Sequence, residues 1–249
     1  MYVFERKKAV VVGGSGGIGS AVSRMLVRNG ASVVIHGSHQ SEKFSRLENE
    51  LNLIASSGQK IECVIQELRP DVFMEFEDSL LGSHVKSADI LCVCYGPFLQ
   101  VPCHEMTASR WNDVALMDFA FPGLCASLSL SNMLEKKWGR MLFFGGTRTY
   151  QVNGFKTNAA YGAAKTALSS LVKSLSLSYS SFGITSNLIC PGFTETEYQS
   201  DLLLESLRMK MPSGKLVQPE SIAEKAFLLL SSPDVNGVLL PVDYGWVPW

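Results

Sequence analysis

The chain has 249 residues, 46% of them hydrophobic, and a formal net charge of −1. Its length suits one α/β domain, and its near neutrality excludes the basic surface that attracts nucleic acid or an anionic membrane. No apolar run approaches the roughly 20 residues of a membrane-spanning helix, and the first residues show no signal-peptide pattern. These features predict a cytoplasmic protein with a single domain, residues 1–249, and neither nucleic acid nor membrane as a partner.

The six cysteines lack the spacing of zinc ligands, so we expect no metal site. Cys92 and Cys94 alternate within an apolar segment and are expected to pack as small hydrophobic side chains. We therefore expect the cysteines to be reduced.

The first forty residues have the pattern strand, glycine-rich turn, helix, strand. Residues 9–12 are an apolar run typical of a buried parallel strand, and five glycines lie within residues 13–19. Apolar side chains then recur at helical spacing, and residues 33–35 predict a second strand. Glycines let the backbone approach a pyrophosphate, and a helix N-terminus offers it unpaired N–H groups. The pattern predicts a dinucleotide-binding turn; the alternative is a turn that is merely flexible.

The rest of the chain alternates strands and helices without a linker or an internal repeat. Further strands are predicted at residues 61–65, 88–94, 141–144, 184–189 and 238–242. Helices are predicted from residue 44 to near 58, and over 72–81, 107–134 (with Thr107 as N-cap) and 157–182. This alternation predicts a mainly parallel, seven-stranded sheet with helices on both faces. Residues 194–216 are the least periodic stretch after the sixth strand.

Tyr161 and Lys165 lie four residues apart in the predicted helix 157–182, so both side chains project from one face. A phenol gives up a proton near neutral pH only if its pKa falls well below about 10, and a nearby ammonium group lowers it. Alternatively, they are an ordinary exposed tyrosine and lysine on an amphipathic helix.

The chain resembles the short-chain dehydrogenase/reductase family over essentially its whole length. The resemblance is carried by Gly13-x-x-x-Gly17-Ile18-Gly19, by Tyr161-x-x-x-Lys165, by the segment 187–196 and by the ending Val242-Asp243-Tyr244-Gly245. It implies a Rossmann-like, doubly wound α/β fold and hydride transfer between NADP or NAD and a small-molecule carbonyl or alcohol. It also implies a homodimer or homotetramer, with residues 194–216 covering the substrate.

The resemblance also implies roles for particular residues. Tyr161 would be the general acid in reduction or the base in oxidation, and Lys165 would lower its pKa and hold the nicotinamide ribose. The implied cofactor-binding residues are Gly13, Ser15, Gly17, Ile18, Gly19, Ser38, Glu67, Gly96, Lys165, Pro191, Gly192, Thr194 and Thr196.

Three departures from the family pattern affect the predicted site. Gly146 stands where the family has a serine that steadies the substrate oxygen, so we expect Thr147 to replace it, with Thr149 as a weaker candidate. Asp118 stands at the family's asparagine, where it could keep Lys165 charged or draw it away from Tyr161. The residues 93–96, VCYG, replace the usual Asn-Asn-Ala-Gly, so of that motif Gly96 alone is kept.

The end of the second strand bears on cofactor choice. No acidic residue occurs at positions 36–39 to bond a free ribose 2′-hydroxyl, which argues against a strict NAD preference. Ser38 and His39 could donate to a 2′-phosphate, so we expect NADP. Glu67 is expected at the adenine edge, with a solvated strand-end charge as the alternative.

Two further classes of function are weighed against an oxidoreductase. The altered positions 93–96, 118 and 146 are compatible with a nucleotide-binding regulator or scaffold that has lost catalysis. Enoyl reduction is less favoured, because family members with that chemistry space the tyrosine and lysine seven apart.

Overall fold

The computed structural model describes residues 3–246 and contains one seven-stranded sheet in which all neighbouring strands are parallel. The strand order is β3-β2-β1-β4-β5-β6-β7. The strands are β1 (Lys8–Val12), β2 (Ser32–Gly37), β3 (Ile61–Ile65), β4 (Ile90–Val93), β5 (Gly139–Phe144), β6 (Ile184–Pro191) and β7 (Leu239–Val242). The predicted doubly wound α/β fold is confirmed.

The central strands are buried on both faces, which explains why their sequences are nearly continuous apolar runs. Val10 lies opposite Val34 of β2 on one side and Leu91 of β4 on the other. Val10 and Val11 face opposite sides of the sheet and join two separate hydrophobic clusters.

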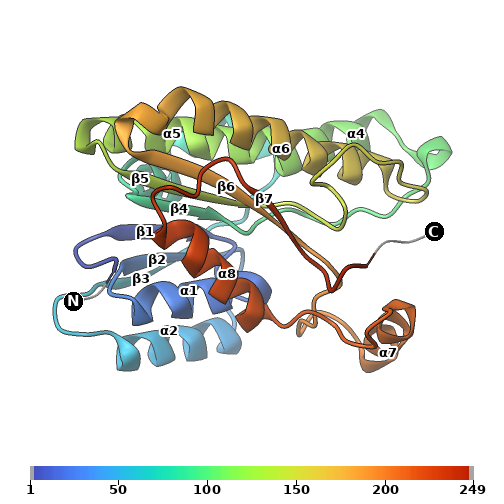
Figure 1. The fold of residues 1–249 in the computed structure, drawn as a ribbon, viewed down its shortest axis with the longest axis horizontal. Coiled ribbons are helices and arrows are strands. Elements are labelled where there is room, and N and C mark those ends of the chain that lie inside the picture. Colours follow the sequence, from blue (N-terminus) through green and yellow to red (C-terminus); the bar gives the residue numbers. More distant parts are fainter. Residues whose placement is uncertain (1–2, 247–249) are drawn as a thin grey trace.

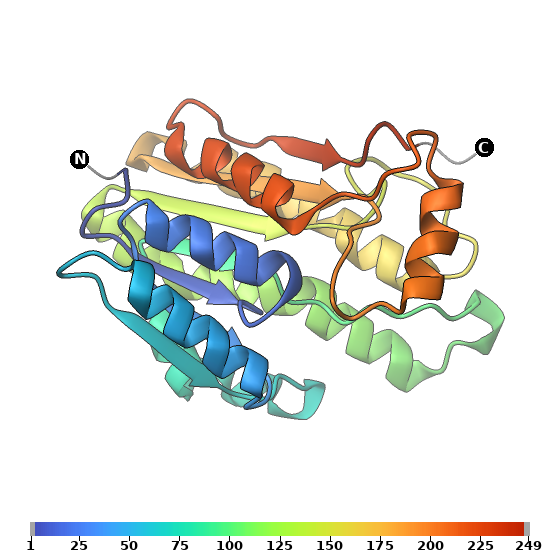
Figure 2. The same ribbon diagram turned by 90° about the horizontal axis from the view of Figure 1, so that it is seen from below.

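Helices cover both faces of the sheet (Figure 1). The helices α1 (Gly17–Arg28), α2 (Glu42–Ile54) and α8 (Pro219–Ser231) cover one face, and α3 (Leu80–Lys86), α5 (Phe121–Lys136) and α6 (Ala159–Tyr179) cover the other. Helix α4 (Ala108–Ala115) precedes α5, and α7 (Asp201–Lys210) stands apart from both layers, beyond the end toward which the strands run (Figure 2).

Several helices differ from the sequence predictions. The predicted helix 72–81 is a 3-10 helix, Pro70–Asp78, followed by α3, and the predicted helix 107–134 is interrupted by a π-helical turn, Leu116–Ala120. Thr107 caps α4 as predicted, since its side chain accepts a hydrogen bond from the Arg110 amide at 3.3 Å. Helices α7 and α8 were not predicted.

The continuous helical stretch Ala108–Lys136 is long and apolar enough to cross a membrane by length and composition alone. The expectation that no apolar run reaches that length is therefore wrong. In this structure the stretch packs against α3 and α6, and the same test is passed by core helices of globular proteins.

The sheet reverses its winding direction between β1 and β4, where the chain leaves toward opposite edges. In open α/β sheets, ligands bind in the crevice outside the carboxyl ends of the strands at such a point. Val12 ends β1 and Val93 ends β4, so the glycine turn and the 94–97 turn border this crevice.

Candidate active site

The glycine turn after β1 is tightly packed, and this accounts for its glycines. Gly13 has a φ of +76°, and a Cβ there would lie 3.0 Å from the backbone nitrogen of Tyr95. A Cβ on Gly19 would overlap the carbonyl oxygen of Gly13. Only residues without side chains allow the turn, the 94–97 segment and α1 to approach this closely.

His36, at the end of β2, braces the glycine turn from behind. Its Nδ1 accepts a hydrogen bond from the Gly13 amide at 3.0 Å, and its Nε2 lies 2.7 Å from the Gln66 carbonyl oxygen. The ring is therefore neutral with its proton on Nε2, because the carbonyl can only accept. Burial lowers the pKa of His36, against the raising effect of the Gln66 carbonyl.

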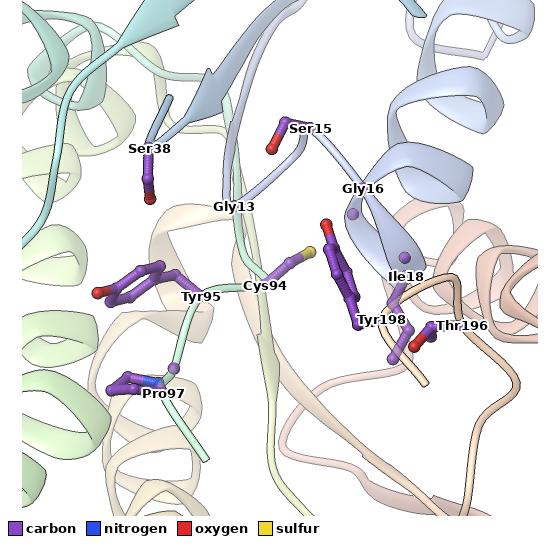
Figure 3. Close-up of a pocket in the computed structure, with 13 residues that line it drawn as sticks. Gly13, Ser15, Gly16, Ile18, Ser38, Cys94, Tyr95, Pro97, Thr196 and Tyr198 are labelled. Carbon is purple, nitrogen blue, oxygen red and sulfur yellow. The ribbon is translucent and has the colours of Figure 1, made fainter. Parts of the chain in front are cut away.

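A cavity of about 350 Å³ opens at the carboxyl edge between the two turns (Figure 3). Its lining residues are Gly13, Ser15, Gly16, Gly17, Ile18, Gly19, Ser38, Cys94, Tyr95, Gly96, Pro97, Thr196 and Tyr198. Eight of the thirteen residues predicted to bind the cofactor belong to this lining. Four others, Glu67, Pro191, Gly192 and Thr194, do not line it, and Lys165 lies just behind Gly96.

The residues outside the lining have structural contacts of their own. Glu67 is half exposed and pairs with Arg69 at 3.5 Å. The Thr194 hydroxyl donates to the Gly192 carbonyl at 3.0 Å, and the Gly192 amide donates to Val242 in β7 at 2.9 Å. Their cofactor contacts remain predictions.

Tyr161 and Lys165 emerge from the first turns of α6 beside the cavity. Lys165 Nζ lies 3.3 Å from Asp118 Oδ1 and donates to the Phe144 carbonyl at 3.3 Å. The Lys165 and Asp118 side chains are 4% and 0% exposed, so their charges interact with little screening. A Cβ on Gly96 would overlap Lys165 Nζ and lie 2.6 Å from Asp118 Oδ1, so Gly96 forms the wall between this ion pair and the cavity.

Burial is the largest cause of the pKa shifts of Asp118, Lys165 and Tyr161. It raises the pKa of Asp118 to about 6, although the Lys165 ammonium opposes the shift. Burial also lowers the pKa of Lys165, against the attraction of Asp118. The pKa of Tyr161 is raised by burial first and then by Asp118, which is opposite to the direction expected from Lys165 alone.

The loop after β5 carries Gly146, at the position of the expected serine, and the two threonines that could replace it. A Cβ at Gly146 would lie 3.2 Å from the Tyr161 hydroxyl, so this position does face the phenol. The Thr147 hydroxyl lies 3.3 Å from the Pro191 carbonyl, to which it donates. Thr149 is buried and bonds the amide and the carbonyl of Gly146, at 2.8 and 2.9 Å, so it fixes the loop.

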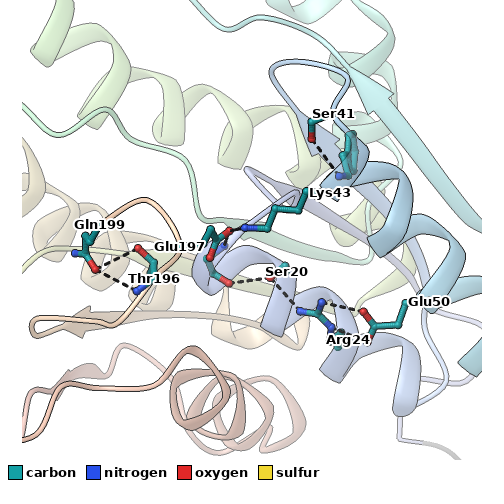
Figure 4. A network of polar contacts seen from close by, with 10 residues as sticks. Ser20, Arg24, Ser41, Lys43, Glu50, Thr196, Glu197 and Gln199 are labelled. Carbon is teal, nitrogen blue, oxygen red and sulfur yellow. Dashed lines mark hydrogen bonds and ion pairs between the residues drawn. The ribbon is translucent and has the colours of Figure 1, made fainter. Parts of the chain in front are cut away.

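Two residues of the site were not predicted from the sequence to lie near the cofactor. Tyr198 lies in the cavity over the start of α1 (Figure 3), and Glu197 accepts a hydrogen bond from the Gly17 amide at 2.9 Å. Glu197 also forms an ion pair with Lys43 of α2 (Figure 4). The sequence gives no signal for this contact, since Glu197 and Gly17 are 180 residues apart.

These residues fit a dinucleotide. The glycine turn lets a pyrophosphate approach the backbone at the N-terminus of α1, and the Gly17 amide already bonds the Glu197 carboxylate, which shows that it takes an anion. No group of three or more His, Cys, Asp or Glu side chains suited to a metal occurs within residues 3–246.

Comparison with known proteins agrees with this geometry. The short chain dehydrogenase family profile matches residues 7–206. The cis-4-hydroxycyclohexanecarboxylate dehydrogenase of Sinomonas cyclohexanicum is 25% identical, across 98% of this chain and 97% of that enzyme. Carbonyl reductase family member 4 of Xenopus laevis is 28% identical, across 96% of this chain and 97% of that protein.

Solved structures show the same fold. A short-chain dehydrogenase/reductase from Serratia marcescens superposes with a TM-score of 0.83 at 22% identity, across 98% of this chain and 99% of that one. The named relatives are dehydrogenases and reductases that act on alcohol or carbonyl groups. The chain therefore belongs to the short-chain dehydrogenase family and is an NAD(P)-dependent oxidoreductase.

Proposed function

We propose that this oxidoreductase prefers NADP and interconverts a carbonyl and an alcohol, with Tyr161 as the general acid or base. One observation carries the assignment: the Lys165–Asp118 ion pair lies directly behind Gly96, which lines the cavity of the glycine turn. Tyr161 lies near this ion pair, since the centre of its ring is 5.9 Å from Lys165 Nζ; its hydroxyl lies against Gly146 and its ring packs edge-on against Phe98 at 5.0 Å. A reacting carbon between them has a proton donor on one side and the dinucleotide pocket on the other.

A nicotinamide bound in this cavity would supply or accept the hydride, and the protein moves the proton. In reduction, Tyr161 donates its phenolic proton to the oxygen of the carbonyl as negative charge develops there. Lys165 stabilises the resulting phenolate by its charge, with Nζ 5.9 Å from the centre of the Tyr161 ring. In oxidation, the phenolate of Tyr161 takes the proton from the alcohol.

Asp118 positions Lys165 in this scheme. Its carboxylate stabilises the ammonium of a buried lysine that desolvation would otherwise neutralise. The same negative charge opposes the ionisation of Tyr161. Asp118 thus favours the protonated phenol, which is the form needed for carbonyl reduction.

Thr147 is proposed to steady the substrate oxygen in place of the missing serine. Its hydroxyl lies on the loop next to Gly146, and its hydrogen bond to Pro191 is long at 3.3 Å, so it can be exchanged for one to a substrate. Thr149 is less suited, because its hydroxyl already bonds the amide and the carbonyl of Gly146 and lies 3.6 Å from Cys190 Sγ.

The NADP preference is supported by the charges around the end of β2. Ser38 lines the cavity, and residues 36–39 contain no carboxylate to repel a 2′-phosphate. Lys43, in the first turn of α2, adds a positive charge next to Tyr198, whose ring centre lies 5.4 Å from its Nζ. We infer that Ser38 and Lys43 together hold the 2′-phosphate.

A cytoplasmic homodimer or homotetramer remains our expectation from the family. Light scattering on the purified protein would measure its mass in solution.

The test is to titrate the protein with NADPH and NADH by fluorescence, and then to assay the preferred cofactor against a panel of ketones and aldehydes. We expect tighter binding of NADPH and measurable turnover. The variant Tyr161→Phe should bind the cofactor normally and lose about 10²- to 10⁴-fold in kcat/KM. Cofactor binding without turnover of any substrate would favour the nucleotide-binding regulator instead.

A further inference from the structure

The anion site at the N-terminus of α1 is filled by a side chain of the protein itself. Glu197 Oε1 accepts a hydrogen bond from the Gly17 amide at 2.9 Å and pairs with the Lys43 ammonium (Figure 4). A helix N-terminus carries unpaired N–H groups and partial positive charge, and here an ammonium group adds to it. One carboxylate thus satisfies two of the groups that a phosphate would seek.

Tyr198, the next residue, fills part of the cavity itself. A Cβ on Gly16 would overlap the Tyr198 hydroxyl, and a Cβ on Gly17 would lie 3.4 Å from the ring. The aromatic ring therefore covers the surface on which a pyrophosphate is expected (Figure 3). The cavity of about 350 Å³ is at the small end of ligand pockets, which span about 300–1,000 Å³.

The contact of Glu197 and Tyr198 with the start of α1 is weak and can be opened. Tyr198 is 72% exposed, and the Lys43 and Glu197 side chains are 52% and 34% exposed, so burial and ion pairing contribute little to it. The start of the segment is held independently. The Glu195 amide donates to Val217 at 2.9 Å, and the Glu195 carboxylate pairs with Arg208 of α7 at 2.7 Å.

We propose that Glu197 and Tyr198 form an internal competitor for the phosphate site, which the dinucleotide must displace before it binds. The inference rests on the proposed function in one respect, that the cofactor binds at the glycine turn. Displacement frees the Gly17 amide and the Lys43 ammonium for the incoming phosphates and moves the segment 196–199. Because a competitor reduces the binding-competent fraction, Glu197 weakens the apparent affinity for the cofactor by that fraction.

The affinity test compares four proteins: the wild type, Glu197→Asp, Glu197→Ala and the control Glu205→Ala, which replaces an exposed glutamate on α7. NADPH and NADH titrations followed by fluorescence should show roughly fivefold tighter binding for both Glu197 variants and no change for the control. Aspartate is the decisive substitution, because it keeps the charge but lacks the methylene needed to reach Gly17. If Glu197→Ala tightens binding while Glu197→Asp does not, the effect is simple charge repulsion and the proposal is overturned.

A second measurement needs no cofactor. Hydrogen exchange of the Gly17 amide, which Glu197 protects in the wild type, should accelerate in both Glu197 variants and stay unchanged in the control. Faster exchange with no dinucleotide binding by any of the four proteins would overturn the proposed function. Equal dinucleotide affinity in all four would overturn the role of Glu197 alone.

Discussion

Asp118 and Lys165 form a buried ion pair, with Oδ1 and Nζ 3.3 Å apart, directly behind the wall of the dinucleotide cavity. A carboxylate at this place acts on two neighbours with opposite results. It holds the charge of Lys165, and it raises the pKa of the Tyr161 phenol beyond the effect of burial. In the mechanism proposed above, the protonation of the phenol, and with it the favoured direction of catalysis, depends on Asp118.

Replacing Asp118 with asparagine should therefore separate the two directions of the reaction. Without the negative charge the phenolate forms more readily, while the asparagine amide oxygen still accepts a hydrogen bond from Lys165. We therefore expect kcat/KM for alcohol oxidation at neutral pH to rise roughly three- to tenfold and its pH profile to move to lower pH. Carbonyl reduction needs the protonated phenol and should change less. Both rates are measured between pH 6 and 10.

The control for this variant is Asp113→Asn, on α4, where the carboxylate is bonded to Ser109 at 3.4 Å and lies away from Lys165. It should leave both profiles unchanged. An Asp118→Asn profile that coincides with the wild type in oxidation would contradict the link between Asp118 and the phenol.

Gly96 should not tolerate a side chain. In Gly96→Ala the new methyl would overlap Lys165 Nζ and lie 2.6 Å from Asp118 Oδ1, so the ion pair must move. We expect kcat/KM to fall on the order of 10²-fold, the usual effect of displacing a catalytic group by about 1 Å. Steady-state kinetics measures the loss.

Gly154→Ala is a matched control for Gly96→Ala, because a Cβ at Gly154 has no atom within 4 Å. It should retain the wild-type rate. Full activity in Gly96→Ala would mean that the ion pair behind it is not required in this position.

The sheet was predictable because its signal is local. Strands such as Lys8–Val12 are buried on both faces and read as apolar runs, and the glycines of the following turn are required by contacts that any dinucleotide turn makes. The pairing of Tyr161 with Lys165 was predictable for the same reason, since both lie on one helix face.

What the sequence did not reveal depends on contacts between distant segments. No contact was predicted for His36, whose ring turns inward to bond Gly13 and Gln66. Glu197 reaches the start of α1 from the other end of the chain, and no local pattern marks it. Burial of the site reversed the expected pKa shift of Tyr161, because desolvation depends on the whole fold.

His36 should make stability depend on pH. Its pKa is lowered in the folded protein, so below about pH 6.5 the unfolded chain binds a proton that the native ring does not. The free energy of unfolding should therefore fall as the pH drops below that point, by at most about 1.4 kcal/mol per pH unit from this residue. Urea unfolding between pH 7.5 and 5 measures it.

The contribution of His36 is isolated by comparison with His36→Gln, which does not titrate. Asp118, with its pKa raised to about 6, acts in the opposite direction, since the native carboxyl binds a proton before the unfolded one does. Asp118 is present in both proteins, so it cancels in their difference. A difference in stability that stays constant from pH 7.5 to 5 would contradict the neutral, bonded ring.

Lys43 should determine the preference between the two cofactors. Its ammonium lies at the start of α2 beside Tyr198, and a charged hydrogen bond to a 2′-phosphate contributes about 1.5–3 kcal/mol, equivalent to tenfold or more in affinity. In Lys43→Gln the ratio of the NADPH and NADH dissociation constants should shift about tenfold toward NADH. The ratio is the proper readout, because loss of the Glu197 ion pair alters the binding of both cofactors alike.

The control is Lys60→Gln, which should leave the ratio unchanged. Lys60 directly precedes β3 and so lies at the amino ends of the strands, opposite the carboxyl edge that carries the cavity. An unchanged ratio in Lys43→Gln would place the discrimination elsewhere, with Ser38 as the next residue to replace.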